Sequence, residues 1–120
     1  MQHHIQSIRT FIGAKNFEES RQFYLAFGFK EVPLGKMSFL GTEGFGFYLQ
    51  DYYVKDWVNN SMIFLEVKDT YAHREAVLKL NLTERFPTVR ISEVVENDWG
   101  KEYFVHDPST VLWHIGEFKE

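Results

Sequence analysis

Residues 97–118 have the sequence NDWGKEYFVHDPSTVLWHIGEF. Two runs rich in aromatic and β-branched residues, KEYFVH and VLWHIG, lie on either side of Asp107 and Pro108. Such runs are typical of strands, and an Asp-Pro pair between them favours a turn. We therefore predict a β-hairpin. Alternation along its second strand places Trp113 on the face that packs under helices and His114 on the opposite face.

The hairpin ends a series of elements that occurs twice along the chain. In each half, the patterns predict a strand, then a helix, then three short strands. The first half is expected to have them, in that order, at residues 7–14, 16–27, 29–34, 37–42 and 45–50. The second half is expected to have them at residues 62–67, 70–80, 88–95, 101–106 and 111–116.

The chain is therefore interpreted as one α+β domain, residues 1–120, made of two βαβββ modules. Module one spans residues 5–50 and module two residues 61–118, and a short helical connector at 51–60 joins them. The halves can be overlaid with RTFIGAKN on MIFLEVKD and FYL on WHI. This overlay makes three pairs, Arg9 with Met62, Phe11 with Phe64, and Tyr48 with His114.

Both long helices carry capping signals. Asn16 is suited to cap the first helix, with Glu19 three residues later as in a capping box, and Gly28 supplies the stop. Asp69 is the corresponding N-cap of the second helix. We expect His73 on that helix to be solvated. The side of the helix that faces the sheet is expected to consist of Ala72, Ala76, Val77 and Leu80.

Composition excludes several classes of function. The 120 residues carry a formal net charge of −4, which lacks the basic surface that nucleic-acid binding needs. The chain has no cysteine, so disulfides, thiolate metal sites and thiol nucleophiles are excluded and a cytoplasmic location is expected. No apolar run is long enough to span a bilayer, and we expect no membrane partner. A neutral or cationic small molecule suits the charge best.

Two stretches carry a resemblance to a known family. ESRQFYLAFGFKEV in the first half and WGKEYFVHDPSTVLWHIGEF in the last resemble the vicinal oxygen chelate superfamily, which includes glyoxalase I, extradiol dioxygenases and bleomycin-resistance proteins. The resemblance covers nearly the whole chain. It implies the glyoxalase/bleomycin resistance/dihydroxybiphenyl dioxygenase fold, in which paired βαβββ modules form a curved cup around a ligand. It also implies a homodimer in which each cup is completed by a module of the other subunit.

The same resemblance locates four positions where metal-using members have ligands, and here they hold Arg9, Tyr48, Met62 and His114. An arginine cannot donate an electron pair, and a thioether is a soft ligand unsuited to the metals of this family. Of the four, only His114 is an ordinary ligand. We therefore expect no metal and no other cofactor.

Metal-free bleomycin-resistance proteins are the nearest comparison, because they also have an Asp-Pro turn before a strand with a histidine. The family usually has glycine where this chain has Thr110. A threonine with positive φ would be strained, so we expect this turn to adopt another shape. His106, just before the turn, is expected to pair with Asp107 or to cap the hairpin.

The ligand-binding residues follow from strand alternation and from the resemblance. Glu66 and Glu102 are the carboxylates expected to face the cup, either for acid–base work or, more ordinarily, to pair with Arg9. No catalytic residue is assigned. Aromatic planes and carboxylates would together suit a planar or cationic ligand. The expected ligand-binding set is Arg9, Phe11, Tyr48, Met62, Phe64, Glu66, Trp99, Glu102, Phe104 and His114.

Three functions remain open from the sequence. The first is a metal-free homodimer that binds a small aromatic or cationic molecule, with antibiotic sequestration as a possible role. The second is a metal-dependent enzyme of the same fold, a glyoxalase-like lyase or a dioxygenase. The third is a dimerising module without a small-molecule ligand.

Overall fold

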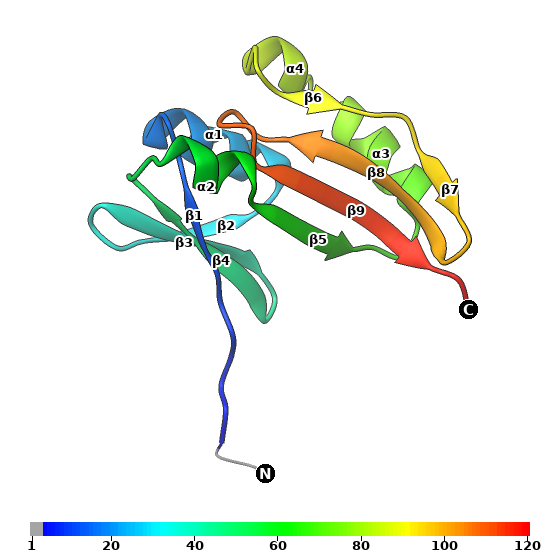
Figure 1. Ribbon diagram of the computed structural model, residues 1–120, viewed down its shortest axis with the longest axis horizontal. Helices are drawn as coiled ribbons and strands as arrows, with labels where there is room; N and C mark the ends of the chain where they lie inside the picture. The colour runs from blue at the N-terminus through cyan, green and yellow to red at the C-terminus, as the bar shows by residue number, and fades with distance from the viewer. Residues whose placement is uncertain (1–3) are drawn as a thin grey trace.

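The computed structural model describes residues 4–120 and has an α+β fold with two mixed sheets (Figure 1). The first sheet has the strand order β1-β4-β3-β2. Its strands are β1 (Phe11–Gly13), β2 (Lys30–Pro33), β3 (Met37–Thr42) and β4 (Phe45–Gln50). The second sheet has the order β5-β9-β8-β6, with β7 also paired to β8. Its strands are β5 (Met62–Glu66), β6 (Arg90–Ile91), β7 (Val95–Asn97), β8 (Gly100–His106) and β9 (Leu112–Phe118).

The two sheets share one pairing pattern. In each, the first strand runs parallel to the last, and the remaining pairs are antiparallel. Phe11 lies opposite Tyr48 in the first sheet, and Phe64 lies opposite His114 in the second. These two registers agree with the overlay of the halves, which matched the same residues. The predicted C-terminal hairpin is confirmed as β8 and β9.

Four helices complete the fold: α1 (Phe17–Phe27), α2 (Lys55–Asn59), α3 (Thr70–Leu78) and α4 (Leu82–Arg85). The predicted caps are confirmed. Asn16 Oδ1 accepts a hydrogen bond from the Glu19 amide at 3.0 Å, and the Asp69 side chain does the same for Ala72. Gly28 ends α1 with φ of 121°, a conformation that favours glycine.

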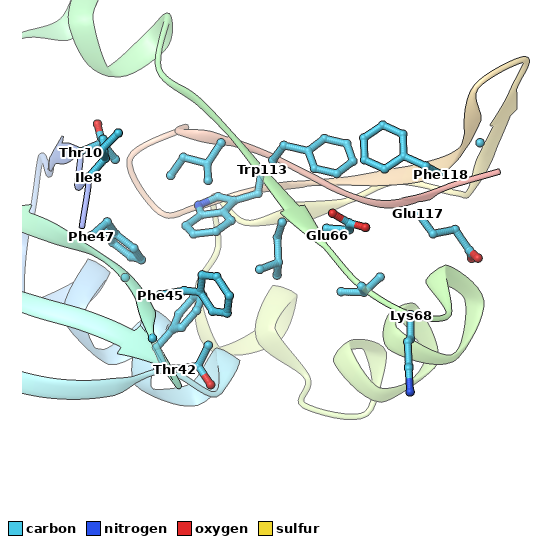
Figure 2. A pocket seen from close by; sticks show the side chains of 18 of the residues that line it. Ile8, Thr10, Thr42, Phe45, Phe47, Glu66, Lys68, Trp113, Glu117 and Phe118 are labelled. Carbon is cyan, nitrogen blue, oxygen red and sulfur yellow. The ribbon is translucent and has the colours of Figure 1, made fainter. Parts of the chain in front are cut away.

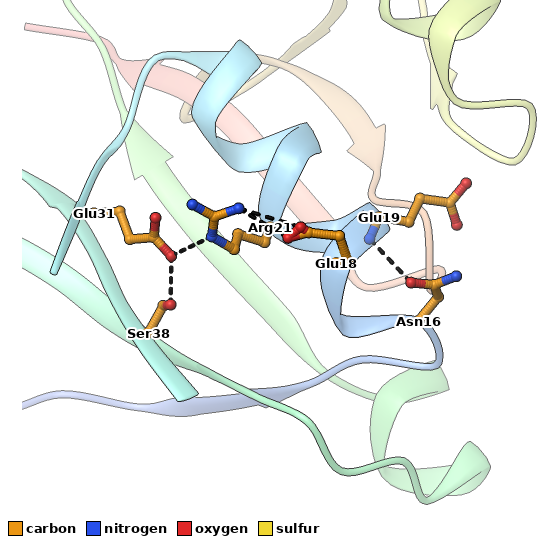
Figure 3. Close-up of polar contacts among 6 residues, drawn as sticks. All are labelled: Asn16, Glu18, Glu19, Arg21, Glu31 and Ser38. Atoms are coloured by element: carbon orange, nitrogen blue, oxygen red, sulfur yellow. Dashed lines mark hydrogen bonds and ion pairs between the residues drawn. The ribbon is translucent and has the colours of Figure 1, made fainter. Parts of the chain in front are cut away.

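Charged side chains join α1 to the edge strand β2 (Figure 3). Arg21 on α1 donates to Glu31 at 2.6 Å and to Glu18 at 2.8 Å. Ser38 on β3 also donates to the Glu31 carboxylate. These bonds lower the pKa of Glu31, chiefly through Arg21. The bonds hold α1 against the first sheet.

The core lies between the helices and one face of each sheet. Trp113 is 3% exposed, which confirms its predicted inward position, and its ring contacts Phe47 and Phe29 of the first half at centroid distances of 5.4 and 5.6 Å. Ile12, Leu49, Tyr103 and Ile115 are buried on the same side. The opposite faces of the two sheets stay partly open to solvent.

A buried polar network crosses from the first half to the second. Tyr24 on α1 donates to the Asp107 carboxylate at 2.5 Å, and Trp113 Nε1 donates to the Tyr24 hydroxyl at 2.9 Å. The Asp107 carboxylate also accepts from the amides of Ser109 and Val111, each at 2.8 Å. The expected pairing of His106 with Asp107 is therefore wrong, because Asp107 points into the core toward α1.

Two expected strands differ from the structure. Pairing of the predicted strand 7–14 is confined to β1, and residues 4–10 are exposed and run away from the body of the molecule (Figure 1). The predicted strand 88–95 is divided into β6 and β7. Between them the Ser92 hydroxyl, rather than a backbone carbonyl, accepts from the Phe104 amide at 2.8 Å. A side chain thus interrupts the backbone ladder, as in a bulge.

The expected faces of the second helix are also partly wrong. Ala72 and Ala76 are exposed, whereas Thr70 and Val77 are buried against the sheet. His73, expected to be solvated, lies at hydrogen-bonding distance from the Tyr103 hydroxyl, 2.6 Å, and burial lowers its pKa. The helix therefore turns a different side toward the sheet than its apolar pattern predicts, because the Tyr103 hydroxyl of the sheet binds His73.

The turn at Thr110 has the conformation that its side chain was expected to avoid. Thr110 has φ of 76°, in the left-handed region. Its hydroxyl donates to Asn59 at 2.8 Å, and its amide donates to the Asp107 carbonyl at 2.9 Å. These bonds offset the strain, so the turn keeps its shape without glycine. None of the helices within residues 4–120 is long and apolar enough to cross a membrane.

Candidate ligand-binding cup

The predicted ligand-binding residues lie on the sheet faces turned away from the helices, which we call the cup faces. Alternation explains their placement: Ile12 and Leu49 are buried, while their neighbours Phe11 and Tyr48 point the other way. The structure divides the predicted set between the sheets. The first sheet has Arg9, Phe11 and Tyr48, and the second has Met62, Phe64, Glu66, Glu102, Phe104 and His114, with Trp99 beside them.

On the first sheet, a cation lies among aromatic rings. The Arg9 guanidinium donates to the Tyr48 hydroxyl at 2.9 Å and lies 4.3 Å from the centroid of the Phe39 ring. Phe11 stacks on Tyr48 at 4.9 Å. A Cβ at Gly46 would overlap the Phe39 ring, so glycine there leaves room for that ring. Arg9 therefore does not pair with Glu66 or Glu102 as expected, because aromatic neighbours on its own sheet bind it.

The second sheet has a histidine–carboxylate pair at the centre of its cup face. His114 Nδ1 lies 2.9 Å from Glu102 Oε1, and Asn97 donates to the other carboxylate oxygen at 3.3 Å. Phe64 and Phe104 lie opposite His114 on its two neighbouring strands. The Phe104 ring meets the imidazole edge to face at 5.0 Å. Two aromatic rings therefore border a polar pair.

An exposed aromatic cluster lies at one end of the same face. Phe64, Trp99 and Phe118 are 41%, 39% and 53% exposed. Phe64 and Phe118 stack at 5.3 Å, and Trp99 lies 5.3 Å from Phe118 and 6.0 Å from Phe64. Phe118 was not in the predicted set. Extending the alternation of the last strand from His114 by four residues would have identified it.

An open groove of about 1210 Å³ lies between the N-terminal segment and β4 on one side and β5 and β9 on the other (Figure 2). Of the predicted residues, only Arg9, Phe64 and Glu66 line it. The remaining seven lie on the open cup faces outside it. Phe45 and Lys68 line the groove and were not predicted, since the turn before β4 and the end of β5 gave no chemical signal.

The four family positions for metal ligands do not fit a metal. Arg9 is positively charged and has no lone pair to offer, and its guanidinium donates a hydrogen bond to the Tyr48 hydroxyl oxygen. Met62 supplies only a thioether, so His114, whose Nδ1 is bonded to Glu102 and whose Nε2 is open, would be the one ordinary ligand of the four. Within residues 4–120, no group of three or more histidine, aspartate or glutamate side chains is placed to hold a metal ion.

The chain resembles known proteins in structure rather than in sequence. No protein-family model matches it, and no curated protein matches it. Among solved structures, it is similar to a bleomycin-binding protein from Streptomyces verticillus in complex with copper(II)-bleomycin, with 15% identity, a TM-score of 0.80, and coverage of 99% of this chain and 100% of that one.

Two further solved structures are similar. An antibiotic-binding protein from a Streptomyces species has 14% identity and a TM-score of 0.75 over 98% of this chain and 100% of its own. Lactoylglutathione lyase from Agrobacterium tumefaciens has 14% identity and a TM-score of 0.67 over 96% of this chain and 99% of its own. The paired pattern of strands and these similarities together show that the chain has the fold that these bleomycin-binding, antibiotic-binding and lactoylglutathione lyase structures share.

Proposed function

We propose that the protein binds a planar, aromatic, cationic small molecule on its cup faces without a metal ion. The observation that carries the proposal is the composition of the second cup face, where Phe64, Trp99 and Phe118 are exposed next to carboxylates. Aromatic planes attract cations and flat rings, and they give a large contact area at a low cost in side-chain entropy. Glu66 and Glu102 supply the negative charge.

The cup is completed by a second copy of the chain. Large apolar side chains are exposed on both cup faces, including Phe11, Met62 and Phe64 at 53%, 65% and 41%. Covering them removes apolar surface from water, at about 25 cal/mol per Å². The faces are also complementary in charge, since the first has Arg9 and the second Glu66 and Glu102. A homodimer that opposes the first sheet of one copy to the second sheet of its partner satisfies both conditions.

Similar solved structures support this class of ligand. Two of them are described as binding bleomycin or another antibiotic. Sequestration of a toxic compound is therefore the proposed biological role. Metal-free binding is supported by the donor set, in which an arginine and a methionine occupy two of the four family ligand positions.

Fluorescence titration tests the proposal, because Trp99 lies in the expected contact surface. Bleomycin and ethidium, a planar cation, should quench tryptophan emission in a saturable way, whereas the planar anion anilinonaphthalene sulfonate should bind weakly. At a ligand concentration of 100 times Kd, the protein should gain about 2.7 kcal/mol of stability. Trp99→Ala should weaken binding at least about tenfold, as loss of an aromatic contact does at an interface.

Tyr71→Ala is the matched control, because Tyr71 is an exposed aromatic residue on α3, on the other side of the second sheet. It should bind like the wild type. Equal weakening by both variants, or no saturable change with any cationic ligand, would contradict the proposal. Stoichiometric zinc, nickel, iron or manganese in the purified protein would contradict its metal-free part. Light scattering should give the mass of a dimer.

A further inference from the structure

We propose that His114 and Glu102 act together as a general base in the cup, so that the protein can remove a proton from a planar carbon acid without a metal. This inference rests on the proposed binding site, since the aromatic walls of that site would hold the substrate. It adds a chemical step to binding. The substrate class is a flat, conjugated molecule with one acidic C–H bond.

The hydrogen bonds of Glu102 indicate which ring nitrogen of His114 carries the proton. Glu102 receives Asn97 Nδ2 at one oxygen and faces His114 Nδ1 at the other. An ionised carboxylate has no proton to donate, so Nδ1 carries the proton and donates it. The lone pair of the neutral imidazole is then on Nε2. None of the hydrogen bonds formed within residues 4–120 involves Nε2 of His114, which leaves this nitrogen free to accept a proton.

The pair of His114 and Glu102 is held in place by its neighbours. Glu102 is only 9% exposed, and its two oxygens have separate partners. Gly116 lies opposite Glu102 on β9, and a Cβ there would come within 2.9 Å of the Glu102 Cβ. The absence of a side chain at Gly116 lets the carboxylate lean over β9 toward His114. A base positioned by a carboxylate in this way needs little reorganisation when it takes a proton.

His114 is accessible to a ligand and is bordered by aromatic side chains. The His114 side chain is 26% exposed, so a ligand can reach it, while Phe64 and Phe104 lie on either side of it. His73 and His106 are poorer candidates. His73 is tied to Tyr103 on the opposite side of the sheet, and burial together with Arg90 lowers the pKa of His106. Among the histidines of the described residues 4–120, only His114 combines a carboxylate partner with an open ring nitrogen on the cup face.

With the planar probe 5-nitrobenzisoxazole, the proposed step is an elimination. His114 Nε2 takes the proton from C3, the electron pair of that C–H bond forms the carbon–nitrogen triple bond, and the ring N–O bond breaks. The product is a cyanophenolate, whose colour reports the reaction. The imidazolium formed on His114 is stabilised by Glu102 and returns its proton to water. No oxidant, reductant or second substrate is needed.

The test measures this elimination with the whole protein over a range of pH. The wild type should show a saturable rate that rises to a plateau as His114 loses its proton. His114→Asn keeps a donor for Glu102 and removes the base, so its rate should fall about 10²–10⁴-fold. Added imidazole should restore part of the rate in His114→Ala. Glu102→Gln should lower the plateau and also move the midpoint of the pH profile to lower pH, because the imidazolium loses its counter-charge.

His106→Ala is the control, since His106 is on the same strand as Glu102 but is outside the proposed dyad; its rate should equal that of the wild type. Glu66 on β5 and Arg90 on β6 are the other charged groups near this face, and they are unchanged in all variants. A wild-type rate equal to that of His114→Asn overturns the proposal. A pH midpoint that is the same in Glu102→Gln and in the wild type also overturns it, because a Glu102 with a merely structural role would affect stability and not the pH profile.

Titration of the same samples with ethidium separates this inference from the proposed function. Saturable binding without any His114-dependent elimination overturns the general base and leaves ligand binding intact. Loss of both binding and elimination overturns both proposals. Circular dichroism of each variant shows that the native fold is present, and His114→Asn is the decisive variant if His114→Ala unfolds.

Discussion

Replacing Asp107 with asparagine should remove a pH-dependent loss of stability. The Asp107 carboxyl is fully buried, and desolvation raises its pKa from 3.8 to about 6, although hydrogen bonds from Tyr24, Val111 and Ser109 partly oppose the rise. A pKa that is higher in the folded protein means that the folded state binds the proton more tightly. The contribution of Asp107 to the stability of the folded state is therefore most favourable at acidic pH and is lost as pH rises through about 6.

The size of the effect follows from the difference between those two pKa values. At 1.36 kcal/mol per pKa unit, this difference in pKa corresponds to about 3 kcal/mol of unfolding free energy, which is lost mainly between pH 4 and pH 7. His73 and His106 act in the opposite direction, because burial lowers their pKa values in the folded protein and their contribution falls as pH decreases. The difference between wild type and Asp107→Asn isolates Asp107 from these histidines.

Urea unfolding followed by tryptophan fluorescence at several pH values gives this difference. The stability of Asp107→Asn relative to wild type should rise by about 3 kcal/mol from acidic to neutral pH, with unchanged dependence on urea concentration. The exposed Asp98 provides the control, and Asp98→Asn should show no such trend. A difference that does not change with pH for Asp107→Asn would contradict the expected pKa rise, because it would mean that the hydrogen bonds fully compensate the burial of the charge.

The other predictions concern single side chains of the core and the cup. Trp113→Ala should lower the unfolding free energy by about 3–5 kcal/mol in the same urea assay, as for other buried aromatic residues, and a near-neutral result would reverse the face assignment of β9. Arg9→Ala should leave the thermal unfolding midpoint nearly unchanged and should alter ethidium affinity, because Arg9 lies on the cup face; unfolding of this variant would show that the residue is structural. Gly116→Ala should destabilise β9, since its Cβ would lie 2.5 Å from the Lys101 carbonyl and 2.9 Å from the Glu102 Cβ. It should also lower the elimination rate by displacing the carboxylate, and a variant with wild-type stability and rate would contradict the crowding argument.

Local chemistry made much of the fold predictable. The helix caps could be predicted because they depend only on neighbours within a few residues. These caps are Asn16 and Asp69 at the helix starts and Gly28 at the end of α1. The alternation around Trp113 also predicts its burial correctly, because one face of the strand is much more apolar than the other. The positions of the strands were predicted from the same kind of local signal, the alternation of side chains between the two faces of a sheet.

Long-range polar bonds limited what could be predicted. The Ser92 hydroxyl interrupts a strand by bonding to Phe104, and Thr110 keeps a strained backbone because Asn59, 51 residues away in the chain, accepts its hydroxyl proton. In the cup, the sequence identified His114 and Glu102 as separate ligand residues. Their pairing depends on the strand register and on the room left by Gly116, and neither appears in a local pattern.

The bonds between Tyr24, Asp107 and Trp113 have a consequence for how the two sheets can move. They tie the first helix to the last hairpin at a point where neither partner can reach water, so separating the two halves would break two hydrogen bonds and expose a carboxylate and an indole together. Closure of the two halves around a ligand is therefore disfavoured. The protein should instead fit a ligand by changes of side-chain rotamer on the cup faces. Ligand binding should follow a single kinetic phase, without the slow second step that closure of the two halves would produce.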